Sequence, residues 1–175
     1  MLRILSLLLV VIFTASKSPQ EYIVVEKRSF SVDVSTSFGD FNCEYQLQTK
    51  DTLFFQSSGK LSRAEYAIPI KAFKCGNFIL NTDFQKTLKA DTYPITSIIL
   101  SDWVPHPNGY RCKVHLNIVG KELFFSNFIV KKNNKTLSGE VVISFTDLEL
   151  PTPRKMGGLL KVKDEITLHI TLETQ

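Results

Sequence analysis

Three observations predict a mainly β fold built from antiparallel strands. Apolar and polar residues alternate along most of the chain from Tyr22 onward, which is the pattern of strands with one buried face. Turn-forming residues, as in Pro105–Gly109, separate the alternating runs. One stretch near the middle, residues 73–95, interrupts the alternation with signals of a short α-helix. Many strands that each have one apolar side must pair into a sandwich or a barrel.

The alternating runs number roughly eight to ten and are joined mostly by tight turns. The last run is long and unbroken, and a closed barrel would pair it on both sides and remove exposed edges. This favours a barrel, and about eight strands leave room for side chains or for one small ligand. In chain order, the expected strands are marked by Phe30, Val32 and Val34; by Phe41, Cys43, Tyr45 and Leu47; by the ranges 53–56, 66–72 and 95–104; by Tyr110, Cys112, Val114, Leu116 and Ile118; by Phe124, Phe125 and Phe128; by Leu137, Val141, Ile143 and Phe145; and by Ile166, Leu168, Ile170 and Leu172.

A short helix is expected over Thr82–Ala90. Thr82 and the glutamine three residues later have the spacing of a capping box, in which Thr82 would be the N-cap. Phe84 and Leu88 lie four residues apart and therefore share one face of the helix. A short helix with such a narrow apolar stripe suits a cover lying across a β-structure.

The first 18 residues have the features of a secretory signal peptide. Arg3 supplies the positive charge, and an apolar run of roughly ten residues follows, which is too short to span a bilayer. Thr14, Ala15 and Ser16 supply small residues, and cleavage is expected near Ala15–Ser18. The sequence therefore predicts a signal peptide over 1–18, a single domain over 19–175, and a mature protein in the periplasm or outside the cell.

Composition and charge exclude some partners and favour others. A hydrophobic content of 43% supports a real core, and the 13 phenylalanines indicate either a crowded core or the wall of an apolar cavity. The formal charge of +4 is mild and the basic residues are scattered, so no nucleic-acid partner is expected. Transient contact with a membrane is an open expectation, and the sequence does not indicate an oligomeric state.

The residues that could carry chemistry do not form a catalytic or metal-binding pattern. His106, His115 and His169 are isolated, without the spacing of a metal-binding motif, and the last two fall on the outward phase of their strands. Asp164 and Glu165 are neighbours on a strand and so point to opposite faces. The sequence therefore predicts a protein that is not an enzyme and that needs no metal or cofactor.

Three segments share their pattern with a known family. They are an F-x-x-x-L-x-A-x-x-Y-P pattern at 84–94, an L-x-I-x-G pattern at 116–120, and a C-terminal end that reads FTDLELPTP and then GGLLKVKDEITLHITL. In this order and spacing they resemble the YceI-like (polyisoprenoid-binding, lipocalin-like) family over roughly the last two-thirds of the chain. The matching residues are Phe84, Leu88, Ala90, Tyr93, Pro94, Leu116, Ile118, Gly120, Asp147, Pro153, Gly158, Val162, Asp164, Glu165 and Ile166.

The resemblance implies an antiparallel, lipocalin-like barrel that holds a long isoprenoid or similar amphiphilic chain in its apolar interior. Arg154 and Lys155 are then candidates to contact an anionic head group, and the alternative, which the sequence favours, is that they are two solvated loop charges. The alternative is a β-domain with a filled core that serves as an adhesion or stress-related interaction module. The expected lining is Phe84, Leu88, Ile98, Leu100, Trp103, Val114, Leu116, Phe125, Phe128, Ile143, Phe145, Leu168 and Ile170.

The three cysteines allow one intramolecular disulfide. An exported chain meets an oxidising compartment, in which disulfides form and persist. Cys75 lies just before the expected helix and Cys43 on an early strand, so a bridge between them would staple the helical segment to the barrel wall. Cys112 falls mid-strand on the apolar phase, where a free thiol behaves as a small hydrophobe. The expected pair is therefore Cys43–Cys75, with Cys112 reduced.

Overall fold

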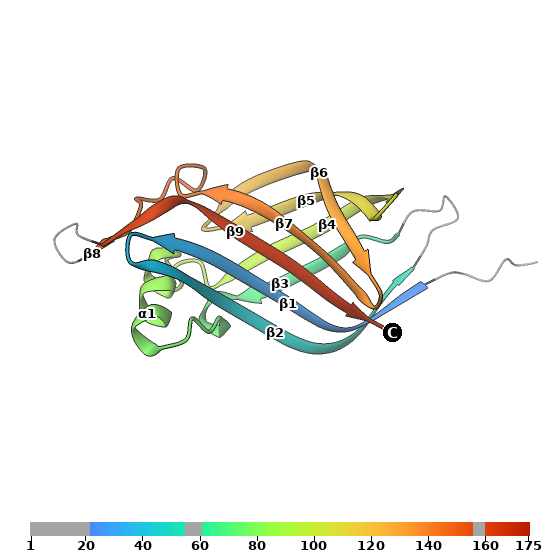
Figure 1. Cartoon of the computed structure of the whole chain (residues 1–175), viewed down its shortest axis with the longest axis horizontal. Helices are drawn as coiled ribbons and strands as arrows, with labels where there is room; N and C mark the ends of the chain where they lie inside the picture. Colours follow the sequence, from blue (N-terminus) through green and yellow to red (C-terminus); the bar gives the residue numbers. More distant parts are fainter. Residues whose placement is uncertain (1–21, 55–60, 156–159) are drawn as a thin grey trace, which may run out of the picture.

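The computed structural model describes residues 22–54, 61–155 and 160–175 (Figure 1). The described chain is an antiparallel, nearly closed β-barrel with one short helix near one end, as the sequence predicts. The expected signal peptide lies outside the described residues. The elements are β1 (Tyr22–Thr36), β2 (Gly39–Phe54), β3 (Ala64–Pro69), the 3-10 turn η1 (Ile70–Ala72), α1 (Phe78–Thr87), β4 (Ile95–His106), β5 (Gly109–Ile118), β6 (Lys121–Asn133), β7 (Thr136–Ser144), β8 (Arg154–Lys155) and β9 (Leu160–Thr174).

The strands form one sheet whose order is β2-β1-β9-β7-β6-β5-β4-β3, with the short β8 paired to β9. All the neighbouring pairs are antiparallel. The long last strand β9 has β1 on one side and β7 on the other, as expected for a closed barrel. Its alternating pattern is therefore explained by partners on both edges and by one buried face.

The barrel closes at the seam between β2 and β3, which are the two ends of the strand order. At one end of the seam, the N–H of Ser62 donates a hydrogen bond of 2.7 Å to the carbonyl oxygen of Phe54. At the other end, Glu44 and Lys74 exchange two backbone hydrogen bonds of 2.9 and 2.8 Å. The structure also joins Cys43 to Cys75, the pairing favoured by the sequence, directly beside that bridge.

β6 and β7 separate shortly after the hairpin that joins them. Within the described residues their ladder consists of three pairs, from Asn133↔Thr136 to Lys131↔Ser138. Beyond this point the two strands diverge (Figure 1). Phe128 of β6 lies against Gly139 of β7, where a Cβ atom would come within 2.5 Å of the ring. We call this divergence the β6–β7 fork, and its base is filled by Phe128.

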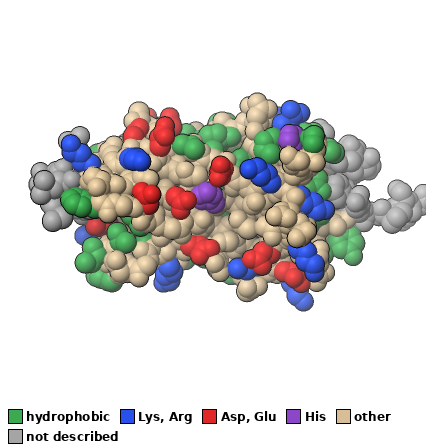
Figure 2. Space-filling model, in the orientation of Figure 1, with side chains coloured by type: hydrophobic (Ala, Val, Ile, Leu, Met, Phe, Trp, Pro, Cys, Tyr) green, Lys and Arg blue, Asp and Glu red, His purple; other side chains and the backbone are tan. Residues whose placement is uncertain are grey.

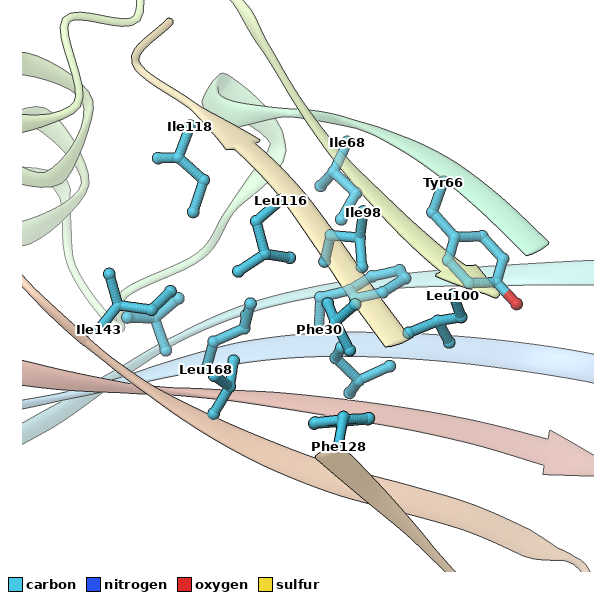
Figure 3. Packing of buried hydrophobic residues seen from close by; sticks show 14 of the residues in the cluster. Phe30, Tyr66, Ile68, Ile98, Leu100, Leu116, Ile118, Phe128, Ile143 and Leu168 are labelled. Atoms are coloured by element: carbon cyan, nitrogen blue, oxygen red, sulfur yellow. The ribbon is translucent and has the colours of Figure 1, made fainter. Parts of the chain in front are cut away.

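The interior is filled by the inward side chains of all the long strands. Phe30, Leu116, Phe128 and Leu168 come from four different strands and converge on the same core (Figure 3). β6 contributes both Phe125 and Phe128 because its register against β5 shifts by one residue between Cys112 and Val114. In such a bulge, one strand has an extra residue relative to its partner. Phe125 and Phe128 are three residues apart, and the extra residue in β6 lets both side chains point inward.

The helix begins and ends earlier than the sequence analysis expected. The prediction of Thr82–Ala90 with Thr82 as N-cap is wrong, since α1 spans Phe78–Thr87. Its N-cap is Asn77, whose side chain accepts a hydrogen bond of 2.9 Å from the N–H of Leu80. The Thr82 hydroxyl instead donates to the carbonyl oxygen of Phe78, one turn back, at 2.8 Å. Asn at an N-cap satisfies an otherwise unpaired N–H as well as Thr does, so the sequence offered two acceptable starts.

The helix ends in a Schellman motif. The N–H of Ala90 donates to the carbonyl oxygen of Gln85 and that of Lys89 to Lys86, at 2.9 and 3.1 Å. Lys89 has a φ of 48°, in the left-handed region where glycine is usual. The end of α1 is therefore set by this turn, well ahead of Tyr93-Pro94.

Candidate functional site

A small apolar cavity lies inside the barrel beneath α1. Its volume is about 40 Å³. Among the described residues of its wall, the only polar side chain is that of Thr96, whose hydroxyl already donates to the carbonyl oxygen of Asn117 at 2.7 Å. The wall therefore offers carbon surface and no free hydrogen-bonding group. Its residues are Val32, Ile68, Ile70, Phe73, Phe84, Leu88, Thr96, Ile98, Ile118, Ile143, Leu148, Ile166 and Leu168.

The helix α1 covers this cavity; it is held at its two ends and contacts the core through few side chains. No residue of α1 is fully buried. Phe84 is half-buried, and its ring packs on Phe73 with centroids 5.2 Å apart. Leu88, the C-cap, is buried. On the N-terminal side, the disulfide at Cys75 and a 2.6 Å hydrogen bond from the Cys75 N–H to the Asn81 side chain tie the helix to the wall.

The structure places five of the thirteen expected lining residues on the cavity wall: Phe84, Leu88, Ile98, Ile143 and Leu168. The other eight belong to the surrounding core and do not border the cavity. Trp103 is one of these: it is fully buried in the core, with its ring edge-on to Tyr110 at 5.9 Å. The eight are Leu100, Trp103, Val114, Leu116, Phe125, Phe128, Phe145 and Ile170.

Eight wall residues were not among the expected lining residues. Val32, Ile118 and Ile166 carried the signal that could have found them, since each lies on the apolar phase of its strand. Phe73 and Leu148 lie outside the strands, where no periodicity indicates a direction. The missed set is Val32, Ile68, Ile70, Phe73, Thr96, Ile118, Leu148 and Ile166.

The phenylalanines of the chain do not gather into the wall of a channel. Phe38, Phe54, Phe78 and Phe124 are exposed on the surface, with exposed fractions from 45% to 82%. Phenylalanine rings therefore supply both the core and the surface of the barrel, and their number alone does not indicate a cavity.

The two basic residues expected near a head group lie at the end of the barrel where α1 is found (Figure 1). Arg154 and Lys155 form β8, whose backbone pairs with Lys161 and Leu160 of β9. The side chains of Arg154 and Lys155 lie outside the described part of the structure, so their contact with a ligand head group stays an expectation.

Two buried titratable side chains, Tyr66 and Cys112, lie in the core and do not border the cavity. Burial raises the pKa of the Tyr66 hydroxyl to about 12, and Arg28 lies over its ring at 5.1 Å. Burial also raises the pKa of the Cys112 thiol to about 12, so that this thiol stays protonated and unreactive near neutral pH. Neither residue supplies an ionised group to the cavity.

Two of the three histidines lie on the outer face of the barrel, as their strand phase indicates. His169 contacts Asp33 through Nε2 at 2.8 Å and Glu140 through Nδ1 at 3.6 Å. His115 stacks on Phe124 with centroids 4.2 Å apart. Within ranges 22–54, 61–155 and 160–175, no group of three or more His, Cys, Asp or Glu is arranged to hold a metal ion.

A second hollow lies outside the barrel along the β6–β7 fork. It is an open groove of about 690 Å³ whose lining includes the inward residues Phe125, Phe128 and Val141 and the outward residues Glu140 and His169. Its mixed polar and apolar lining and its openness distinguish it from the enclosed apolar cavity under α1.

Comparison with known proteins gives a match at the level of fold. No protein-family model matches the chain, and no curated protein sequence matches it. Among solved structures, it is similar to a polyisoprenoid-binding domain from Saccharophagus degradans, with a TM-score of 0.53 at 9% identity over 90% of this chain and 100% of that one. It is also similar to BcnA of Burkholderia cenocepacia, with a TM-score of 0.52 at 18% identity over 83% and 94%.

The YceI protein of Campylobacter jejuni gives a similar result, with a TM-score of 0.52 at 17% identity over 70% of this chain and 78% of that one. These identities are low, so the comparisons establish a common fold. The chain thus has the lipocalin-like fold of YceI-like proteins, as its sequence motifs suggested.

Proposed function

We propose that the barrel binds one long apolar chain, of the isoprenoid or fatty type, in the interior beneath α1, and that it does so without catalysis. The observation that carries the proposal is the cavity wall, which is carbon throughout except for a hydroxyl already hydrogen-bonded. The shared fold with a polyisoprenoid-binding domain supports the same ligand class. Such a wall recognises hydrocarbon and offers nothing to a polar substrate.

Binding of a chain requires the cavity to widen. Benzene and xenon bind an engineered protein cavity of about 150 Å³, and this cavity has about 40 Å³. The side chains best placed to move are Phe84 and Leu88, because they border the cavity from α1 and its C-cap, and no residue of α1 is fully buried. We therefore place the ligand-binding change at α1, with Phe84 and Leu88 moving outward as the chain enters.

The energy available from the wall is sufficient without a head-group contact. Each buried methylene contributes about 0.8 kcal/mol, so about ten enclosed carbons contribute roughly 8 kcal/mol before the cost of ordering the chain and of opening the cavity. A contact of Arg154 and Lys155 with an anionic head would add to this, since both lie at the end of the barrel that α1 covers.

We also propose that the protein is exported. Residues 1–18 have the composition of a signal peptide, and the Cys43–Cys75 disulfide requires an oxidising compartment to persist. We therefore place the protein in the periplasm or outside the cell.

The second candidate is an interaction module with a filled core. The small volume of the cavity favours this candidate, because a barrel whose interior is nearly filled by its own side chains can serve as a rigid platform. In that case ligands and partners would use the outer surface, and the interior would stay closed.

The test is the presence and uptake of lipid. One sample of purified protein is extracted with solvent and the extract is analysed by mass spectrometry, and a second, folded sample is offered a fluorescent polyprenol. We expect bound chains or uptake at about one per barrel. If folded protein carries no chain and takes up neither polyprenol nor fatty acid, the filled-core module replaces the binding function.

A matched pair of variants locates the site. Ile118→Phe adds a ring to the cavity wall, whereas Ile99→Phe makes the same change at a half-buried residue of β4 that does not border the cavity. We expect Ile118→Phe to reduce uptake strongly and Ile99→Phe to leave it near wild type, with folding of both verified by circular dichroism. Equal uptake by both variants would place the ligand elsewhere.

A further inference from the structure

The end of the barrel near α1 exposes large apolar side chains. Phe78 and Ile79, in the first turn of α1, have exposed fractions of 82% and 70%, and Phe38, in the turn between β1 and β2, has 71%. None of the three contributes to the core. A helix start and a strand turn that leave such residues in water indicate a surface that binds something apolar.

These residues lie at the same end of the molecule. The disulfide from Cys43 to Cys75 brings the segment before α1 to β2, a few residues from the β1–β2 turn. The N–H of Ser37, in that turn, donates to the carbonyl oxygen of Lys161 in β9 at 2.9 Å. In the space-filling view, hydrophobic side chains gather at this end, over α1 and the β1–β2 turn (Figure 2).

The segment that contains α1 carries an excess of positive charge. Residues 70–95 contain four lysines and two aspartates, which gives 4 − 2 = +2. One lysine and one aspartate neutralise each other in the Lys71–Asp91 ion pair of 2.5 Å. Lys74 and Lys86 are exposed, and the described part of the structure gives neither an ion pair. We call Phe38, Phe78 and Ile79, together with Lys74 and Lys86, the basic apolar end.

We infer that the basic apolar end docks on a lipid bilayer that contains anionic head groups. Phe78 and Ile79 would enter the interfacial region, and Lys74 and Lys86 would meet the head groups. Apolar side chains flanked by lysines are the combination that holds peripheral proteins on anionic membranes. No helix of the described residues is long and apolar enough to cross a bilayer.

Charge favours a membrane over a protein partner. Lysine is depleted from the buried cores of protein interfaces, where it would lose its hydration. At a membrane surface it keeps its hydration and gains attraction to anionic lipids. Asp40, at the start of β2 beside the β1–β2 turn, reduces the net charge and limits the expected affinity to a transient contact.

Docking at this end would bring α1, which covers the cavity, against the bilayer from which an apolar chain would be taken up. This role of docking in ligand transfer rests on the proposed function, but the binding of the protein to vesicles can be measured without any ligand in the barrel. Wild-type protein that takes up polyprenol from detergent but does not bind vesicles would reject docking and keep the proposed function.

The experiment is co-sedimentation of full-length protein with vesicles of phosphatidylglycerol and phosphatidylcholine, and with vesicles of phosphatidylcholine alone. The test variant is Phe78→Ser/Ile79→Ser, and the control is Phe54→Ser, which replaces an exposed phenylalanine at the far end of β2. All of them share residues 1–21, so their differences report the described residues. A third variant, Lys74→Gln/Lys86→Gln, tests the charge.

We expect the test variant to bind anionic vesicles roughly tenfold more weakly than wild type, and the control to bind like wild type. The lysine variant and added salt should weaken binding to anionic vesicles and leave binding to neutral vesicles unchanged. Equal binding by wild type and the test variant would overturn the inference. So would a wild-type dimer that the test variant dissociates on size-exclusion chromatography, because the surface would then be a protein interface.

Discussion

Phe128 and Gly139 are in such close contact that the glycine position has no room for a side chain. A Cβ at residue 139 would lie 2.5 Å from Cζ of Phe128 and 2.7 Å from the carbonyl oxygen of Ile129. The contact sits where β6 and β7 part, so it closes the base of the β6–β7 fork.

We expect Gly139→Ala to lower the free energy of unfolding by about 1–3 kcal/mol, the usual cost of overpacking. The oxygen of Ile129 is backbone and cannot rotate away, so the strands themselves must shift. Urea denaturation measures the loss, and Ser138→Ala, on the neighbouring residue of the same strand, is the control. A stable Gly139→Ala protein would show that β6 and β7 spread apart at little cost.

The end of α1 offers a stabilising change. Lys89 is in a left-handed conformation that costs a non-glycine residue about 1 kcal/mol or more. Lys89→Gly should therefore raise the free energy of unfolding by about 0.5–1 kcal/mol, since the greater freedom of glycine in the unfolded chain offsets part of the gain.

The matched control for that change is Lys86→Gly, inside the same helix. There the substitution should lower the free energy of unfolding by about 1 kcal/mol, because glycine is a poor helix former. Opposite signs at positions 86 and 89, measured by thermal or urea denaturation, would verify where the helix ends. A loss of stability at both positions would contradict the Schellman motif.

The strand pattern was predictable from the sequence because barrel strands have one buried face. The alternation through Phe30, Val32 and Val34 required no knowledge of partners, and all three are buried. The break in register near Phe125 and Phe128 was different. Both face inward only because of a bulge, and a bulge depends on the partner strand.

The helix and the cavity were harder to predict. Asn77 and Thr82 are both chemically suitable N-caps, and only the tether at Cys75 and the packing of the segment decide between them. The cavity wall includes Phe73 and Leu148, which lie outside the strands. The volume of a cavity depends on how all these side chains fill space together, and no periodicity reports that quantity.

The disulfide should be a main source of stability. It closes a loop of 32 residues, for which the chain-entropy model gives roughly 3.5–4 kcal/mol as an upper value. We expect Cys43→Ser/Cys75→Ser to lower the free energy of unfolding by up to about this amount. Wild-type protein under reducing conditions, once unfolded and refolded, should behave like the variant.

Thiol counting checks the pairing. Oxidised protein should show one reactive thiol after denaturation and almost none before, because Cys112 is buried and burial raises the pKa of its thiol to about 12. Peptide mapping that found Cys112 in the bridge would contradict the pairing in the structure.

Phe84 provides the sharpest test that the cover controls a ligand. Its ring borders the cavity and packs on Phe73, yet it is only half-buried. We expect Phe84→Ala to lower the free energy of unfolding by about 1–2 kcal/mol, less than the 3–5 kcal/mol typical of a fully buried phenylalanine. Loss of the ring opens the cavity toward solvent, so a bound polyprenol should also dissociate faster.

The two effects are separated by measuring dissociation of a fluorescent polyprenol from protein that circular dichroism shows to be folded. Phe124→Ala is the control, because Phe124 is 69% exposed on the outer face and does not border the cavity. Faster release from Phe84→Ala alone would place the exit under α1. Unchanged release from Phe84→Ala, together with faster release from Gly139→Ala, would move the exit to the β6–β7 fork, where Phe128 would then be the side chain that retains the ligand.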